Sequence, residues 1–184
     1  MGAESPTAEA IDSSTTLQSP VVLARTGRDK QRYREEGQRL VAGCIPVRAC
    51  ADGSRGVEVL MVNSKHGDGL IFPKGGWETD ETAEEAAARE SMEEAGVRGD
   101  LQELGEFEFS SKSRKKEGKK GPQASCIAAV FVMQVTEEMD VWPEQAERSR
   151  TWCHPSYAIA NCRHEWMQDA LRQWGRRFQP ELQL

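Results

Sequence analysis

The sequence predicts a single domain of the α/β or α+β class, in which strands and helices interleave. A chain of 184 residues that is 38% hydrophobic and 29% charged is long enough to bury a core of its own. From about residue 40, short apolar runs alternate with turn residues, which is typical of β-strands. Two further segments have the composition or the spacing of helices. This alternation favours helices that pack on a sheet.

The elements can be placed in chain order. We expect strands where apolar runs are bounded by turn residues, at 40–48, 57–63, 70–72, 102–109, 125–135 and 149–153, with a hairpin loop at 51–56. The segment 81–95 is dense in Glu and Ala, which are strong helix formers, and Gly96 is placed to end that helix. Thr79 or Asp80 is its expected N-terminal cap. A last helix is expected from a stripe of large apolar residues at helical spacing: Tyr157, Ile159, Trp166, Met167, Ala170, Leu171, Trp174 and Phe178.

The negative charge is concentrated in one segment. Of the formal net charge of −6, residues 77–97 carry −7 and the rest of the chain carries +1. The chain therefore lacks the overall positive charge of a simple nucleic-acid binder. Apolar runs stay well short of the roughly 18 residues that suggest a membrane span. Five scattered cysteines without a Cys-x-x-Cys pair favour a reducing compartment, and they do not have zinc-ligand spacing.

Residues 1–30 are predicted to form a disordered tail ahead of a domain at 31–180. The tail is rich in Ser, Thr, Ala and Pro and shows no helical or strand period. Its acids Glu4, Glu9 and Asp12 argue against an organelle transit peptide, because such peptides are poor in acids. We therefore expect the protein in the cytoplasm, or in the nucleus as well, and we expect a monomer.

Three carboxylates in the Glu-rich segment point to metal chemistry. Glu90, Glu93 and Glu94 stand at i, i+3 and i+4, so on a helix they project from one face. Like charges at this spacing repel each other, and a hard divalent cation would offset the repulsion. Mg²⁺ takes oxygen ligands and is commonly held by one or two carboxylates together with water and substrate phosphates. For an isolated pair of glutamates, a solvated helix face is the usual interpretation.

The pattern around these carboxylates favours the metal site. Seven residues form the pattern: Gly75, Glu81, Arg89, Glu90, Glu93, Glu94 and Gly96. Five residues separate the first two, seven separate Glu81 from Arg89, two separate Glu90 from Glu93, and one separates Glu94 from Gly96. The chain thereby resembles the Nudix hydrolases at every charged and glycine position of their signature. Ser91 departs from the family, which has an apolar residue there, and this predicts a local packing cost without loss of chemistry.

The resemblance implies a fold, a reaction and a set of metal ligands. The fold would be an α/β/α sandwich with a mixed central sheet, and the reaction would be cleavage of a diphosphate linked to a second group. Glu90, Glu94 and the carbonyl of Gly75 would hold Mg²⁺, for which Mn²⁺ can substitute. Glu93 would be the general base or a further metal ligand. These roles agree with the chemistry, because metal-bound water needs a nearby carboxylate to take its proton.

The other signature residues would be structural. By the resemblance, Arg89 and Glu81 would orient the site, and Gly96 would end the helix. Glu81 has a second interpretation as a first-turn acid that the helix dipole favours, and both remain open.

Longer stretches resemble one subgroup, the diphosphoinositol polyphosphate phosphohydrolases, over residues 39–170. The similar stretches are 59–66, 72–76, 96–99 and 148–152, and those at 142–144 and 162–164 resemble plant members. The resemblance implies inositol pyrophosphates and diadenosine polyphosphates, such as diadenosine hexaphosphate, as substrates. The alternatives are hydrolysis of mRNA caps or nucleoside diphosphate derivatives, and a non-catalytic module that binds polyphosphate or RNA. The intact set of three carboxylates argues against the non-catalytic module.

Such substrates are densely anionic and need cations besides the metal. Six lysines and arginines lie within residues 112–120, in a stretch that is either a solvated loop or a substrate-binding loop. Trp77 either stacks on a base or covers the core. We expect a small polyphosphate as partner, no membrane, and no nucleic acid other than capped RNA. The expected substrate contacts are Arg39, Ser64, Lys65, Lys74, Gly76, Lys112, Arg114 and Arg148.

Overall fold

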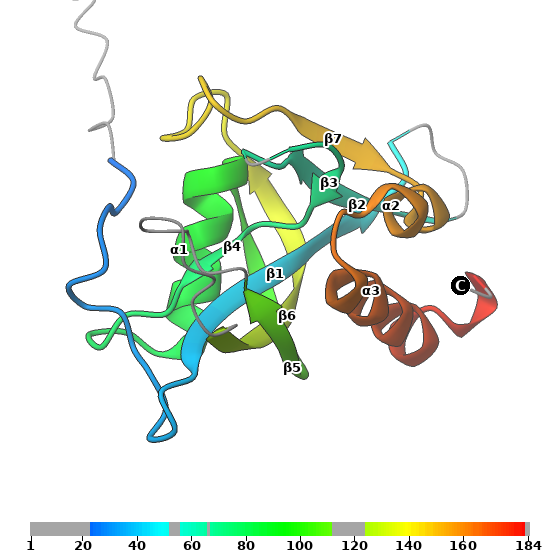
Figure 1. Cartoon of the computed structure of the whole chain (residues 1–184). Coiled ribbons are helices and arrows are strands. Elements are labelled where there is room, and N and C mark those ends of the chain that lie inside the picture. Colours follow the sequence, from blue (N-terminus) through cyan, green and yellow to red (C-terminus); the bar gives the residue numbers. More distant parts are fainter. Residues whose placement is uncertain (1–22, 52–55, 66, 112–123, 183–184) are drawn as a thin grey trace, which may run out of the picture.

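The computed structural model describes residues 23–51, 56–65, 67–111 and 124–182. Figure 1 shows a sheet with helix α1 (Ala83–Ala95) on one side and the helices α2 (Pro155–Asn161) and α3 (Glu165–Phe178) on the other. A short 3-10 helix, η1 (Pro180–Leu182), follows α3. This is the layered α/β arrangement that the sequence predicts.

The sheet is mixed and has seven strands. The main path runs β3-β2-β1-β6-β5, while β4 pairs with β1 and β7 pairs with β2. The pair β1·β6 is parallel and the other pairs are antiparallel. The strands are β1 (Arg39–Ala49), β2 (Val57–Asn63), β3 (Leu70–Ile71), β4 (Lys74–Gly76), β5 (Val97–Ser111), β6 (Ala124–Glu138) and β7 (Arg150–Cys153).

Strand β4 was not predicted, and it places the glycine of the signature. Its Lys-Gly-Gly sequence suggests a turn, because glycine is depleted in strands. Here it pairs with β1, with Ala42 opposite Gly75 and Val41 opposite Gly76. Helix α1 lies against both β1 and β4. The pairing therefore holds the backbone of Gly75 beside the carboxylates of α1.

The predicted C-terminal helix is divided into two. Between α2 and α3 the chain returns to the sheet, where Cys162 forms a parallel bridge with Leu70 and Arg163 N donates to Leu70 O at 2.9 Å. These contacts use backbone groups that a continuous helix would bond internally. Met167, Leu171 and Trp174 of α3 are fully buried, in agreement with the predicted stripe.

Ser91 is fully buried, at a position where the resembling sequences have an apolar residue. Its Oγ donates to Ala87 O, one turn earlier in α1, at 2.8 Å. A buried hydroxyl is costly only when it lacks a partner. The hydrogen bond therefore reduces the packing cost that the sequence predicts.

The segment before β1 contacts the domain earlier than the sequence predicts. The tail residues 1–22 lie outside the described residues, but those from Leu23 onward run beside α1 (Figure 1). Thr79 N donates to Lys30 O at 2.8 Å, and Lys30 Nζ pairs with Asp80 at 2.8 Å. The folded part of the chain thus begins before the predicted boundary at residue 31.

Helix α1 is capped by Thr82 rather than by Thr79 or Asp80. The Thr82 hydroxyl accepts from Glu85 N at 3.1 Å, and the Glu85 carboxylate accepts from Thr82 N at 2.8 Å. This reciprocal pair is a capping box. At the other end, Gly96 has φ of 63°, a left-handed conformation that favours glycine.

Thr82→Ala should lower the free energy of unfolding by about 1 kcal/mol, because it removes the cap of α1. Urea unfolding would measure the change. Thr79→Ala, at the position where the sequence suggested a cap, is the matched control and should cost less than about 0.5 kcal/mol. Equal losses in the two variants would place the cap elsewhere.

Candidate active site

Helix α1 carries the three predicted carboxylates on one buried face. The side chains of Glu90, Glu93 and Glu94 are 12%, 5% and 7% exposed. Carboxylates are rarely buried unless they are paired. Glu90 is paired with its neighbour Arg89, while Glu93 and Glu94 also accept from donors in other parts of the chain.

Gly75 lies directly against one of these carboxylates. A Cβ added to Gly75 would overlap the carboxyl group of Glu90. Only glycine lets the β4 backbone approach so closely. The backbone of Gly75 and the Glu90 carboxylate are thus neighbours.

Arg89 connects the helix to the loop that precedes it. Its guanidinium bonds both oxygens of Glu81, at 2.9 and 2.7 Å, and donates to Gly76 O at 2.9 Å. The same group contacts Glu90 at 2.7 Å and Glu93 at 3.2 Å. Glu81 also accepts from Glu78 N at 3.0 Å. The structure therefore brings Arg89 and Glu81 together and orients two of the three carboxylates.

A second cation, Arg148, faces the third carboxylate. It is 7% exposed and donates from Nη2 to Glu94 Oε1, while its Nη1 donates to Asn63 O at 2.9 Å. Lys74 N donates to the other oxygen of Glu94 at 3.0 Å. Arg148 Nε reaches Glu144 at 2.9 Å, and this carboxylate also binds Lys65 at 2.8 Å.

Burial dominates the electrostatics of the carboxylates. It raises the pKa of Glu90 to about 7, helped by the charge of Glu94 and opposed by Arg89. Burial also raises the pKa values of Glu93 and Glu94, against the backbone N–H of Arg25 and the charge of Lys74 respectively. Perturbed pKa values of this kind are common at functional sites.

The donor set fits a hard divalent cation, although the side chains are not gathered around one. Within the described ranges, no three His, Cys, Asp or Glu side chains are arranged to hold a metal ion. The carboxylates instead face the guanidinium groups of Arg89 and Arg148. Buried carboxylate oxygens are nevertheless the ligands that Mg²⁺ prefers, and the backbone of Gly75 lies against one of these carboxylates.

The predicted substrate residues form two groups beside the carboxylates. Arg39 borders a polar pocket of about 60 Å³ next to Glu90, together with Gly76, Arg25 and Arg28. Lys65, Lys74 and Arg148 lie on the Glu94 side. Ser64 follows β2 and donates from N to Gly69 O at 3.3 Å. The predicted contacts Lys112 and Arg114 lie outside the described residues.

Two residues of the site were missed by sequence reasoning. Arg25 was assigned to the tail, yet its N–H donates to Glu93 at 3.2 Å and its guanidinium pairs with Glu78 at 2.6 Å. Glu144 was noted only for a resemblance. Its place four residues before Arg148 was the available signal, because acid and base at this spacing meet on a helical turn.

Trp77 covers the core rather than offering a free face. It packs against the core cluster, and its Nε1 donates to Glu81 O at 2.9 Å. The guanidinium of Arg32 stacks on its ring at 4.9 Å from the centroid. Trp77 thus supports the loop that leads into α1.

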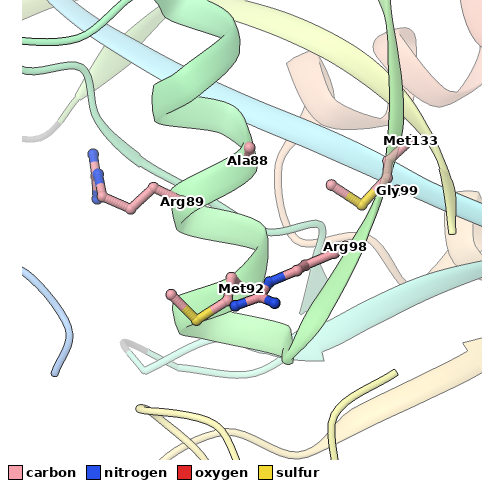
Figure 2. A pocket seen from close by; sticks show the side chains of 6 residues that line it. All are labelled: Ala88, Arg89, Met92, Arg98, Gly99 and Met133. Carbon is pink, nitrogen blue, oxygen red and sulfur yellow. The ribbon is translucent and has the colours of Figure 1, made fainter. Parts of the chain in front are cut away.

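A groove of about 380 Å³ lies on another side of α1. It is lined by Ala88, Arg89, Met92, Arg98, Gly99 and Met133. Figure 2 shows Arg98 and Met133 on the β5 side of the helix, while the Arg89 guanidinium points to the opposite side. The groove therefore lies away from the side of α1 to which the Arg89 guanidinium points. None of the described helices is long and apolar enough to span a membrane.

Comparison with known proteins identifies the family. Residues 37–178 match the NUDIX domain. The chain is 51% identical to Nudix hydrolase 16, mitochondrial, of Arabidopsis thaliana over 158 residues, covering 82% of this chain and 86% of that protein. It is 46% identical to Nudix hydrolase 12, mitochondrial, of the same plant, covering 89% and 85%.

Solved structures agree on the fold. A NUDIX hydrolase from Nitrosomonas europaea has a TM-score of 0.59 at 15% identity and covers 76% of this chain and 89% of its own. A C. elegans Ap4A hydrolase has a TM-score of 0.53 at 20% identity and covers 74% and 95%.

The prediction of a cytoplasmic or nuclear protein is wrong. The relatives called Nudix hydrolases 16, 13 and 12 are all named as mitochondrial. The prediction depended on acids in the first 12 residues, which lie outside the described part of the chain. Acids in a tail are thus a weak argument against import.

The family match extends well beyond the short signature. It covers the whole sheet and the three α-helices, since it begins just before β1 and ends with α3. Nudix hydrolases act on small molecules and use divalent metal ions. The chain belongs to the Nudix family and is a Nudix hydrolase.

Proposed function

We propose that this hydrolase is a Mg²⁺-dependent pyrophosphohydrolase whose substrates are inositol pyrophosphates and diadenosine polyphosphates. The observation that carries the proposal is the placement of cations on both sides of the carboxylates. Arg28 and Arg39 lie by Glu90, while Arg148 lies by Glu94 and is linked to Lys65 through Glu144. A substrate with several phosphates on each side of the scissile anhydride would use both groups.

The carboxylates and Gly75 have distinct roles in this proposal. Glu90, Glu94 and the carbonyl of Gly75 would hold Mg²⁺, which neutralises charge on the phosphoryl oxygens and makes water more acidic. Glu93 accepts the proton of the attacking water. Arg89 holds Glu90 and Glu93 in position from the other side. In this proposal Glu93 takes the proton of the water, while Glu90 and Glu94, on the same helix face, hold the metal.

The proposed substrates can be tested with purified protein. Diphosphoinositol polyphosphate and diadenosine hexaphosphate, at equal concentration, should both be hydrolysed only when Mg²⁺ is present. Glu93→Gln should lower kcat at least about 100-fold, because it removes the proton acceptor. Glu84→Gln removes an exposed acid of the same helix and should leave kcat unchanged. Full activity of Glu93→Gln would exclude Glu93 as the base, and faster turnover of capped RNA would assign a different substrate.

Gly75→Ala should separate the metal site from the fold. The added Cβ would push the Glu90 carboxyl group aside, and this group ends a flexible side chain. We expect the Mg²⁺ concentration for half-maximal activity to rise at least about tenfold. The free energy of unfolding should change by less than about 1 kcal/mol. A variant with unchanged Mg²⁺ dependence would argue against Gly75 as part of the metal site.

The titration of Glu90 predicts how stability depends on pH in the absence of metal. Its folded pKa is raised from 4.5 to about 7, so its contribution to stability is complete below pH 4.5 and is lost as the pH rises through 7. Wild type should therefore lose on the order of 2 kcal/mol relative to Glu90→Gln between about pH 5 and about pH 8. Urea unfolding of both proteins with a chelator would measure this difference. A difference that does not change with pH would contradict the raised pKa.

A further inference from the structure

Four side chains of alternating charge form a line at the C-terminal end of α1. Lys65 binds Glu144 at 2.8 Å, Glu144 binds Arg148 at 2.9 Å, and Arg148 in turn binds Glu94. Arg148 is thus held between two carboxylates. One of them, Glu94, is a proposed metal ligand, while Glu144 has no assigned role.

A metal at Glu94 would take away one of the two carboxylates that pair with Arg148. The Arg148 and Glu94 side chains are each only 7% exposed, so solvent supplies little compensation of its own. A buried charge that loses its partner is strongly unfavourable. The metal and the guanidinium also repel each other, since both are positive. Unless another group keeps Arg148 in place, the guanidinium must move when the metal binds, and the cost of that movement weakens metal binding.

Glu144 meets this need because its position does not depend on Glu94. Its backbone N donates to Glu93 O, at the end of α1, at 3.0 Å. Its backbone O accepts from Arg148 N and from Glu147 N, at 2.9 Å each, so the turn is bonded internally. Asn63 O contributes a further acceptor to Arg148 at 2.9 Å. Lys65 and Arg148 also lower the pKa of Glu144 against the effect of burial, which keeps it charged.

We propose that Glu144 is a positioning residue that retains Arg148 when Glu94 turns to the metal, and that it thereby sets the metal affinity of the site. The inference rests on the proposed function, which makes Glu94 a metal ligand. Arg148 and the metal are alternative partners of Glu94, and Glu144 stabilises the arrangement in which Arg148 has released it. The guanidinium of Arg148 then stays beside the carboxylates, where the proposed function has it bind a substrate phosphate.

Glu144 could also favour metal binding simply because it is negatively charged, and the chain offers a control for this effect. Glu147 lies in the same turn and pairs with Lys65 at 2.5 Å, but its side chain is 64% exposed. Its carboxylate binds the same lysine as Glu144 does, while Arg148 bonds Glu144 and Glu94. Glu147→Gln therefore removes an equal charge close by without affecting the proposed exchange.

The test is a Mn²⁺ titration of the full chain without substrate, followed by electron paramagnetic resonance at fixed pH and ionic strength. Glu144→Gln should weaken Mn²⁺ binding about tenfold, and Glu147→Gln less than about twofold. Arg148→Gln removes the competing cation and should bind Mn²⁺ at least as tightly as wild type. In the Arg148→Gln background, Glu144→Gln should cost less than about twofold, since there is no guanidinium left to retain. Glu144→Asp keeps the charge and should return affinity to within about threefold of wild type.

The outcomes separate this inference from the proposed function. Equal losses for Glu144→Gln in the two backgrounds, or an equal loss for Glu147→Gln, would overturn the positioning role. The positioning role would also be overturned if the single variant Glu144→Gln bound Mn²⁺ as tightly as wild type. If wild type binds Mn²⁺ but hydrolyses no polyphosphate, the proposed substrates fail while the role of Glu144 is still measured. Thermal unfolding of each variant shows whether it is folded. If Glu144→Gln is not folded, Mn²⁺ binding by Glu144→Asp that is weaker than wild type by more than about threefold would overturn the positioning role.

Discussion

The burial of three carboxylates within two turns of one helix is the constraint on which the rest of the structure depends. Glu90, Glu93 and Glu94 repel each other and lose solvation, and burial is the first cause of each raised pKa. Such a helix face is stable only where other parts of the fold supply positive charge. Arg89 does so within the helix, and every other donor comes from a different element.

Those donors explain the course of the chain around α1. The segment before β1 brings Arg25 N to Glu93, strand β4 brings Lys74 N to Glu94, and the loop before β7 brings Arg148. The carboxylates and the cations around them are therefore one electrostatic unit. Arg148 is proposed to bind phosphate and pairs with Glu94, so a change in the charge of Glu94 acts on it directly.

Sequence reasoning succeeded where a local pattern decides the structure, and it failed where a distant contact does. Strands β1, β2 and β6 and helix α1 were predicted close to their observed bounds, because apolar alternation and helix-forming residues act locally. Strand β5 begins at Val97, five residues before its predicted start. Strand β4 and the break between α2 and α3 depend on pairing with β1 and β3, which neither Gly75 nor Cys162 reveals in its own neighbourhood. The contacts of Arg25 were missed for the same reason.

The sequence by itself determined the family, the fold class and the spacing of the carboxylates, because a helix turns intervals of three and four residues into one face. Only the tertiary structure decided which groups compensate them. Arg25 is 68 residues from Glu93, while Lys74 and Arg148 are 20 and 54 residues from Glu94. Pairing over such separations follows from how the sheet and its loops close around the helix, and no local pattern records it. The role proposed for Glu144 became visible only at that level.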